Sequence, residues 1–289
     1  MSVALRHVVG MAAVTGGIVL CALLPFLPGR YESLAVHLSV LARVLGRAGL
    51  LLVPAGAAWL AYEISRRRAG VQAAAGRDRS HVFGIAALIA ASLVGVVVTI
   101  AALAFSGPVL GVVTLALCAL GIWTAERRMR HVPRADPRPA LAMPLALVVV
   151  PVAVGLLHWA TVSPMIESSR NRAMDGCAAL IEDIERYRAA HGRYPASLLA
   201  LWNDYPLSSI GIREYEYEPS GEAYNLCFEH PAEALDTLEI VMFNPLDQQV
   251  MTSHDSDLLR RTPEELEARR GFHAVHEAGR PHWKVFWFD

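Results

Sequence analysis

The chain has 289 residues, of which 54% are hydrophobic and only 18% are charged. An ordinary soluble domain carries about 25% charged residues, so the composition argues against a wholly soluble protein. Residues 1–164 carry 14 Arg, no Lys and 5 acidic residues, whereas residues 165–289 carry 12 basic and 22 acidic residues. An acidic second half disfavours nucleic-acid binding, which needs a basic face. The sequence therefore predicts a basic membrane part and an acidic soluble part.

Five apolar segments follow one another in the first part of the chain. The predicted spans cover about residues 8–27, 45–64, 82–105, 109–124 and 140–162, of which the second and fourth are short. About 20 mostly apolar residues suffice to cross a bilayer. One such segment could be a buried helix of a soluble protein, but five in a row predict a transmembrane helical domain over residues 1–164. The first span is not followed by a small-residue cleavage site, so we expect it to be retained.

Arginine placement predicts the orientation of these spans. The loop after the second span holds five arginines between Arg66 and Arg79, and the loop after the fourth holds five between Arg127 and Arg138. Positively charged loops stay in the cytoplasm. We therefore expect a cytoplasmic N-terminus, an outer loop near Gly29 and a C-terminal domain outside. Lys284 is the single lysine of the chain, which is typical of GC-rich bacterial genomes and predicts a bacterial inner membrane and a periplasmic domain.

Four polar residues fall near the predicted outer ends of the spans: His37, Arg43, Arg47 and His158. Arg43 and Arg47 stand one helical turn apart, so both can snorkel to the interface or contribute to an interaction surface. No Asp or Glu lies in the middle of a predicted span, which disfavours a proton or ion pathway. A membrane enzyme or transporter with these four residues at the outer interface between bundle and soluble domain remains the alternative function.

The soluble domain, residues 165–289, begins with a predicted amphipathic helix over Met165–Ala190. Its apolar positions, Met174, Cys177, Ile181 and Ile184, are three or four residues apart and form one stripe. Gly192 is placed to cap the helix C-terminus, with Pro195 shortly after it. We expect this stripe to pack against the rest of the domain.

Strand patterns then dominate the domain. Period-two alternation predicts strands at residues 214–218, 223–229, 237–243 and 282–288, with short helices at 196–202 and 262–271. The grouping of helices apart from strands indicates an α+β fold, with one long helix on an antiparallel sheet of about four strands. In the last strand, Trp283 and Trp287 alternate with Phe286 and Phe288, so we expect the two residue types on opposite faces. Trp283 and Trp287 are possible interface residues.

The passage from Ala178 to Pro195, with its Glu185-Arg186-Tyr187 and His191-Gly192-Arg193-Tyr194-Pro195, resembles the helix-to-loop region of type IV pilins and type II secretion pseudopilins. The later Tyr215-Glu216-Tyr217 and Tyr224-Asn225-Leu226 are similar to the first hairpin of that fold. The resemblance covers about 80 residues and implies a pilin-like fold in which an apolar helix continues into the globular domain. The chain lacks the pilin leader before this helix and has four spans instead, so the resemblance does not imply filament assembly.

Chemistry-bearing residues are few in the soluble domain. Cys177 and Cys227 could form a disulfide in an oxidising compartment, or remain two buried thiols. His273, His276 and His282 are weak metal candidates because Gly271, Gly279 and Pro281 make their surroundings loop-like. No phosphate-binding loop, dinucleotide fingerprint or nucleophile motif occurs in the sequence, so we expect no cofactor and no catalytic residue. The expected function is a non-enzymatic, membrane-anchored periplasmic interaction module that binds an envelope protein or component.

Overall fold

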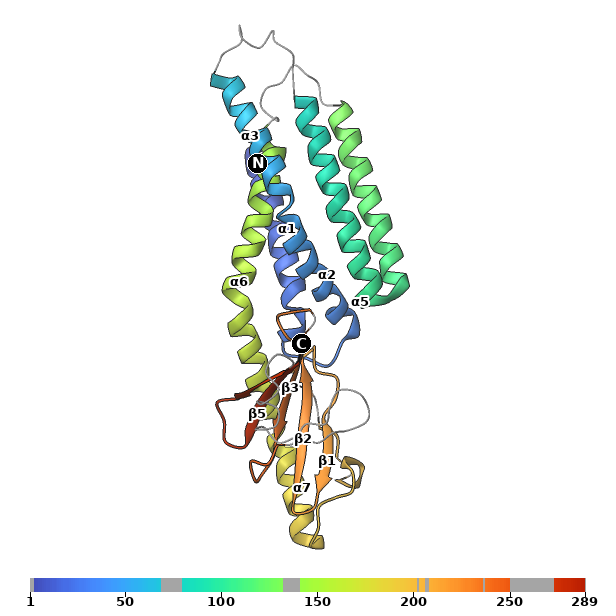
Figure 1. The fold of residues 1–289 in the computed structure, drawn as a ribbon, viewed down its shortest axis with the longest axis vertical. Helices are drawn as coiled ribbons and strands as arrows, with labels where there is room; N and C mark the ends of the chain where they lie inside the picture. Colours follow the sequence, from blue (N-terminus) through green and yellow to red (C-terminus); the bar gives the residue numbers. More distant parts are fainter. Residues whose placement is uncertain are drawn as a thin grey trace. The chain divides into compact units, whose positions relative to one another are not determined.

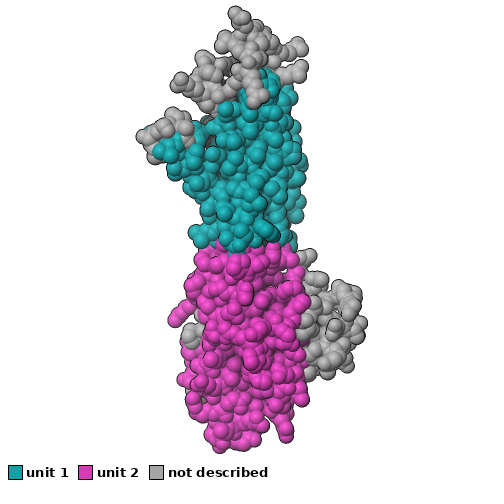
Figure 2. All heavy atoms as spheres, turned by 90° about the vertical axis from the view of Figure 1, so that its left-hand side faces the viewer, with its two compact units in different colours: residues 1–22, 37–161 teal, residues 23–36, 162–289 magenta. Residues whose placement is uncertain are grey.

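The computed structural model describes residues 3–68, 80–131, 141–201, 203–205, 208–235, 237–249 and 273–288. The chain is mostly helical, with several long apolar helices and one antiparallel sheet of five strands (Figure 1). It divides into two compact units, which Figure 2 colours separately. The first unit comprises Met1–Ala22 and His37–Thr161, and the second comprises Leu23–Val36 and Val162–Asp289.

The helices of the described chain are α1 (Val3–Leu23), α2 (Ser33–Gly49), α3 (Leu52–Arg68), α5 (Ser80–His131), α6 (Ala142–Gly176) and α7 (Ala178–His191), with short 3₁₀ helices η1 (Leu24–Phe26) and η3 (Leu198–Leu201). Within the residues that the structure describes, three stretches are long and apolar enough to cross a membrane: Leu5–Phe26, His81–Arg127 and Ala142–His191. The α2–α3 pair, bent by 44°, raises the number to four if it acts as one span. The sequence predicted five spans.

The count of three or four takes α5 as one stretch, although α5 contains two of the predicted spans. Gly107 has φ 83° and ψ 173°, a conformation outside the helical region, and Pro108 follows it. Glycine adopts a positive φ without steric cost, so the chain can reverse here. A Cβ added at Gly95 would lie 3.3 Å from Cβ of Cys118, so the two halves of α5 pack side by side (Figure 1). The predicted spans 82–105 and 109–124 therefore fall in the two halves of one broken helix.

The predicted second span, residues 45–64, also falls across a break. Helix α2 ends at Gly49 and α3 begins at Leu52, with Pro54 in its first turn. Proline is tolerated in the first turn of a helix but not in its interior, because it has no N–H to donate. The continuous 20-residue helix expected here is therefore replaced by two helices bent relative to each other.

In the second unit, a helix packs on an antiparallel sheet. The strands are β1 (Glu216–Ser220), β2 (Ala223–His230), β3 (Leu238–Phe243), β4 (His273–Glu277) and β5 (Trp283–Phe288), in the order β1-β2-β3-β5-β4. Every neighbouring pair is antiparallel. The helical region that faces the sheet is the end of α6 together with α7, separated only by Cys177. This agrees with the predicted helix, which Gly192 caps in a left-handed conformation with φ 70°.

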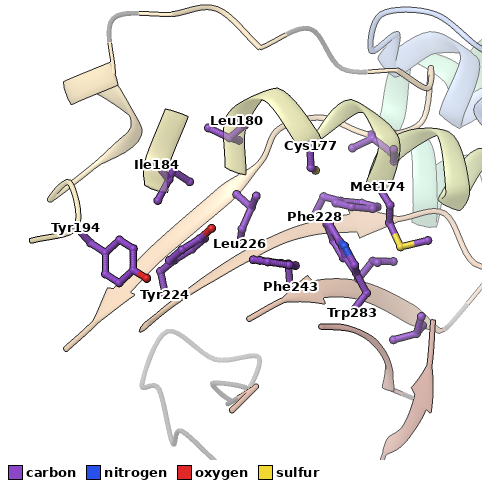
Figure 3. Packing of buried hydrophobic residues seen from close by; sticks show 14 residues of the cluster. Met174, Cys177, Leu180, Ile184, Tyr194, Tyr224, Leu226, Phe228, Phe243 and Trp283 are labelled. Atoms are coloured by element: carbon purple, nitrogen blue, oxygen red, sulfur yellow. The ribbon is translucent and has the colours of Figure 1, made fainter. Parts of the chain in front are cut away.

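The main core lies between this helix and one face of the sheet (Figure 3). Met174, Cys177 and Ile184 from the predicted stripe are at most 3% exposed, and Leu180 is fully buried where Ile181 was expected. The strands contribute large side chains, and the fully buried members include Tyr224, Leu226, Phe228 and Val241. Trp283 belongs to this core, whereas Phe286 packs with Met242 on the opposite face, so the predicted separation of Trp from Phe is confirmed.

Strand β4 was missed, and it makes the sheet five-stranded rather than four-stranded. It pairs with β5 so that Val275 faces Phe286, and the connection contains Gly279 and His282 at positive φ. Gly279 and Pro281 had been interpreted as signs of an irregular segment. They belong instead to a tight hairpin turn, which needs such residues. The predicted helix at 262–271 lies outside the described residues.

The segment Leu23–Val36, hereafter the 23–36 segment, joins the second unit although the sequence placed the domain boundary at 164. Phe26 is fully buried, and the amides of Ile210 and Gly211 donate to the carbonyls of Leu27 and Pro25 at 3.0 and 2.8 Å. Gly211 makes the close approach possible, because a Cβ there would lie 2.8 Å from Cβ of Pro25. Backbone pairing and one aromatic anchor thus fix this segment to the domain.

Candidate functional site

Three neighbouring strands each place one polar side chain in the same row on the helix-facing side of the sheet. The register pairs Glu239 of β3 with His230 of β2 and with Trp287 of β5. Side chains of directly paired residues lie about 5 Å apart at Cβ. Strand pairing alone therefore brings an imidazole, a carboxylate and an indole together.

Glu239 is the centre of this row. The indole Nε1 of Trp287 donates to Oε2 of Glu239 at 2.8 Å, and Nδ1 of His230 lies 3.0 Å from Oε1. Helix α6 adds Arg170, whose Nε and Nη2 donate to the same carboxylate at 2.8 to 3.0 Å. A forked arginine–carboxylate pair is among the stronger hydrogen-bonded arrangements in proteins. Helix and sheet are thereby joined by a charged contact at this end of the core.

Two serines extend the network on the other side of His230. Nε2 of His230 lies 3.1 Å from Oγ of Ser169 on α6, which donates to Oγ of Ser209 at 3.0 Å. Ser169 and Ser209 have no exposed surface, and His230 and Glu239 are 1% and 2% exposed. Buried polar groups are costly unless they are paired. We define the buried network as Ser169, Arg170, Ser209, His230, Glu239 and Trp287.

The network sets the protonation state of its carboxylate. Burial raises the pKa of Glu239, but hydrogen bonding and charge from His230 and Arg170 outweigh burial, so the pKa lies below its ordinary value. Charged partners favour the ionised form of an acid. Glu239 is therefore a carboxylate in the folded protein at neutral pH.

This lowered pKa predicts a pH dependence of stability. Since the folded-state pKa of Glu239 is below the unfolded one, its contribution is complete above the unfolded value, about pH 4.3, and is lost as the pH falls through the folded value. We expect the midpoint of thermal unfolding of the second unit to fall on acidification below that pH. The Glu239→Gln variant should show a smaller fall over the same range. Equal falls in both proteins would contradict the assignment.

A pocket of 580 Å³ lies against the network within the second unit. Its walls come from α6, the β2–β3 connection and the β4–β5 hairpin, and its lining includes Ile166, Glu167, Arg170, Glu233, Glu277 and Trp287. Pockets of about 300 to 1,000 Å³ are the size that binds small ligands or single side chains. Trp287 is 39% exposed, so part of its ring surface is accessible to a ligand.

The two predicted interface tryptophans have different environments. Trp283 is 5% exposed and packs within the main core against Phe228 and Phe243. It is therefore not available as a surface residue, because the end of α6 and α7 covers this face of the sheet. Trp287, on the same face, lies beyond the core at the pocket and is the one of the pair that a ligand can reach.

The predicted residues of the membrane part lie in the first unit. Arg43 is 7% exposed and Arg47 is exposed, so the two arginines on successive turns of α2 do not share one environment. His37 on α2 and His158 on α6 are both half-buried.

Two of the three candidate metal ligands of the C-terminal region, His276 and His282, contact different residues. His276 packs on the Trp287 ring with centroids 4.3 Å apart, and Nδ1 of His282 lies 3.1 Å from a carboxylate oxygen of Asp247. His273 and His276 lie on strand β4, where the helical spacing that makes His-x-x-His a chelate does not apply. Within the described residues, no group of three His, Cys, Asp or Glu could hold a metal ion.

The candidate disulfide is not formed, and both thiols are free. Cys177 packs in the main core on the helix side, whereas Cys227 packs with Met242 and Ile240 on the opposite face of the sheet. Cys227 follows Leu226, and successive residues of a strand point to opposite faces. The sheet therefore separates the two sulfurs, an arrangement that does not favour the predicted pairing.

We expect both thiols to be protected in the folded protein. Burial raises the pKa of Cys177 and of Cys227 to about 12, so almost no thiolate is present at pH 8. Maleimide labelling followed by mass spectrometry should modify both residues only after denaturation, without prior reduction. Protection that disappears on adding a reductant to the denatured protein would instead demonstrate a disulfide.

Five members of the buried network were not identified from the sequence: Ser169, Arg170, Ser209, His230 and Glu239. A signal existed in the strand patterns. His230 continues the core-facing positions Tyr224, Leu226 and Phe228. Glu239 likewise continues Val241 and Phe243 on β3. A polar residue in phase with a core-facing row indicates a buried polar contact.

Comparisons with protein-family models, with curated proteins and with solved structures gave no match to this chain.

Proposed function

We propose that the chain is a multi-pass protein of the bacterial inner membrane whose C-terminal domain is a non-enzymatic binding module in the periplasm. The proposal combines the long apolar helices with the arginine-rich loops at residues 65–81 and 125–139. Positive loops favour the cytoplasmic side, so the N-terminus lies inside and the C-terminal domain outside. The partner is an envelope protein.

Packing of the 23–36 segment in the second unit supports this orientation. A segment that pairs by backbone hydrogen bonds with Ile210 and Gly211 must lie on the same side of the bilayer as they do. The arginine distribution independently assigns the 23–36 segment and the C-terminal domain to the outer side of the membrane. The two assignments agree, although one rests on charge and the other on packing.

The pocket beside the buried network is the observation that carries the binding function. It combines a volume suited to a ligand with a partly exposed tryptophan held by a hydrogen bond. Binding sites gain affinity when their anchoring aromatic residues are already fixed in place. The pilin-like likeness belongs to the same proposal: a helix packed on an antiparallel sheet supports it, and such a domain can serve recognition without filament assembly.

Crosslinking and pull-down from native membranes test this proposal, with tagged full-length chain as bait. We expect a specific envelope protein to co-purify with wild-type chain and to be lost with Trp287→Ala. The matched control is Leu199→Ala, which removes an apolar side chain that is 86% exposed and does not line the pocket. Recovery of the same proteins by all three baits would contradict binding through the pocket.

A hydrolytic enzyme is the second candidate, because Ser169, His230 and Glu239 make the contacts of a nucleophile, base and orienting acid. Their distances, 3.1 and 3.0 Å, suit such a triad. However, the Ser169 hydroxyl is fully buried, so a substrate carbonyl cannot reach it in this conformation. Labelling of wild-type chain, but not of Ser169→Ala, by a fluorophosphonate probe would favour the enzyme.

A further inference from the structure

The pocket carries an excess of negative charge. Its charged lining residues in the described chain are Glu167, Glu233, Glu239 and Glu277 against Arg170. The bidentate pair with Glu239 neutralises Arg170, and the carboxylates of Glu167 and Glu277 at the pocket are both exposed. The field in the pocket therefore favours a cation and disfavours anionic lipid headgroups.

Trp287 gives the pocket an aromatic wall of defined chemistry. Its indole N–H is already donated to Glu239 at 2.8 Å, so the residue can offer a ligand its ring surface but no hydrogen-bond donor. The negative face of an indole ring attracts ammonium and guanidinium groups, more strongly than other aromatic rings do. Carboxylates around a tryptophan are a combination that selects organic cations over neutral or anionic groups.

We propose that this pocket binds a lysine or arginine side chain presented by a peptide segment of the envelope partner. The inference rests on the proposed binding function and specifies the chemistry of the ligand. The cation lies against the ring of Trp287, and Glu167 and Glu277 compensate its charge. A volume of 580 Å³ accommodates one long basic side chain and the peptide groups around it. Because Arg170 and Glu239 hold the indole in place, they act as positioning residues.

Fluorine NMR of the full-length chain tests the ligand class directly. The protein is labelled with 5-fluorotryptophan and held in phosphatidylcholine nanodiscs, whose neutral lipid does not bind cationic peptides. The Trp287→Phe variant assigns the Trp287 resonance among the six tryptophans. The probes are acetylated, amidated tripeptides of lysine, glutamine and glutamate. We expect only the lysine peptide to shift the Trp287 resonance, and added salt to weaken its binding.

Charge variants connect the shift to the pocket. We expect Glu167→Gln combined with Glu277→Gln to weaken binding of the lysine peptide about tenfold, as desolvated cation contacts allow. Glu222→Gln is the matched control, because Glu222 is exposed at the β1–β2 turn and does not line the pocket, and it should bind like wild type. Equal weakening by the control would overturn the assignment to the pocket.

The remaining outcomes separate this inference from the proposed function. Equal shifts with the glutamine peptide would overturn the cation preference. A failure of all three peptides to shift the resonance would overturn it as well. Loss of the envelope partner with Trp287→Ala in the pull-down would still uphold the proposed function in either case. Tighter binding of free spermidine than of the lysine peptide would overturn the assignment to a peptide.

Discussion

Replacing Glu239 with alanine should lower the free energy of unfolding of the second unit by about 3 kcal/mol. The carboxylate is 2% exposed and accepts hydrogen bonds from Arg170 and Trp287 while contacting His230. Its removal leaves the guanidinium of Arg170 without its partner in a largely buried position. Thiol labelling of Cys177 during urea unfolding of the full-length chain in detergent measures the change, since Cys177 is fully buried in the core.

A matched variant separates this effect from a simple change of charge. Glu222→Ala also removes one carboxylate, but from an exposed turn, and should change the unfolding free energy by less than about 0.5 kcal/mol. The conservative Glu239→Gln keeps the volume and one acceptor, so it should fall between the two. A Glu239→Ala protein that unfolds at the wild-type urea concentration would contradict a central role for this contact.

The second large effect on stability is expected for a substitution at Phe26, which is distant in sequence from the C-terminal domain. Phe26→Ala should destabilise the C-terminal domain by about 3 kcal/mol, the cost of emptying a well-packed aromatic site. The ring is fully buried and lies 6.0 Å from the His230 ring, centroid to centroid. Its carbonyl also accepts a hydrogen bond from Arg172 of α6. The same Cys177 labelling assay reports this loss, although residue 26 precedes the domain by more than one hundred residues.

Leu34→Ala provides the comparison for this variant. Leu34 lies in the same 23–36 segment but is 55% exposed, so its truncation should leave the urea midpoint of the domain nearly unchanged. If Phe26→Ala also left the urea midpoint of the domain unchanged, the 23–36 segment would not be an integral part of the domain.

Local patterns predicted much of the second unit. The three- and four-residue spacing of Met174, Cys177, Ile181 and Ile184 identified the helix stripe that faces the sheet, and Gly192 identified its end. Alternation located four strands and separated Trp283 from Phe286. These predictions held because each depends on the period of one element and on solvent exposure, which a short stretch of sequence already encodes.

Features that depend on distant pairing were not predicted. Strand β4 exists because β5 pairs with it, and its turn residues alone indicated an irregular segment. The 23–36 segment joins the domain through Phe26 and Gly211, whose partners lie far apart in the chain. The buried network requires the register of three strands and the rotation of α6 together. Sequence patterns within single elements do not contain this information.

Labelling of introduced cysteines in intact cells tests most directly that the C-terminal domain and the 23–36 segment lie together outside the membrane. Tyr31→Cys and Glu222→Cys place thiols at exposed positions in the two parts, and Gly76→Cys lies in the arginine-rich loop predicted to be cytoplasmic. A membrane-impermeant maleimide that crosses the outer membrane should modify the first two in intact cells, and Gly76→Cys only after lysis. Modification of Gly76→Cys in intact cells, with protection of Tyr31→Cys and Glu222→Cys until lysis, would contradict the orientation.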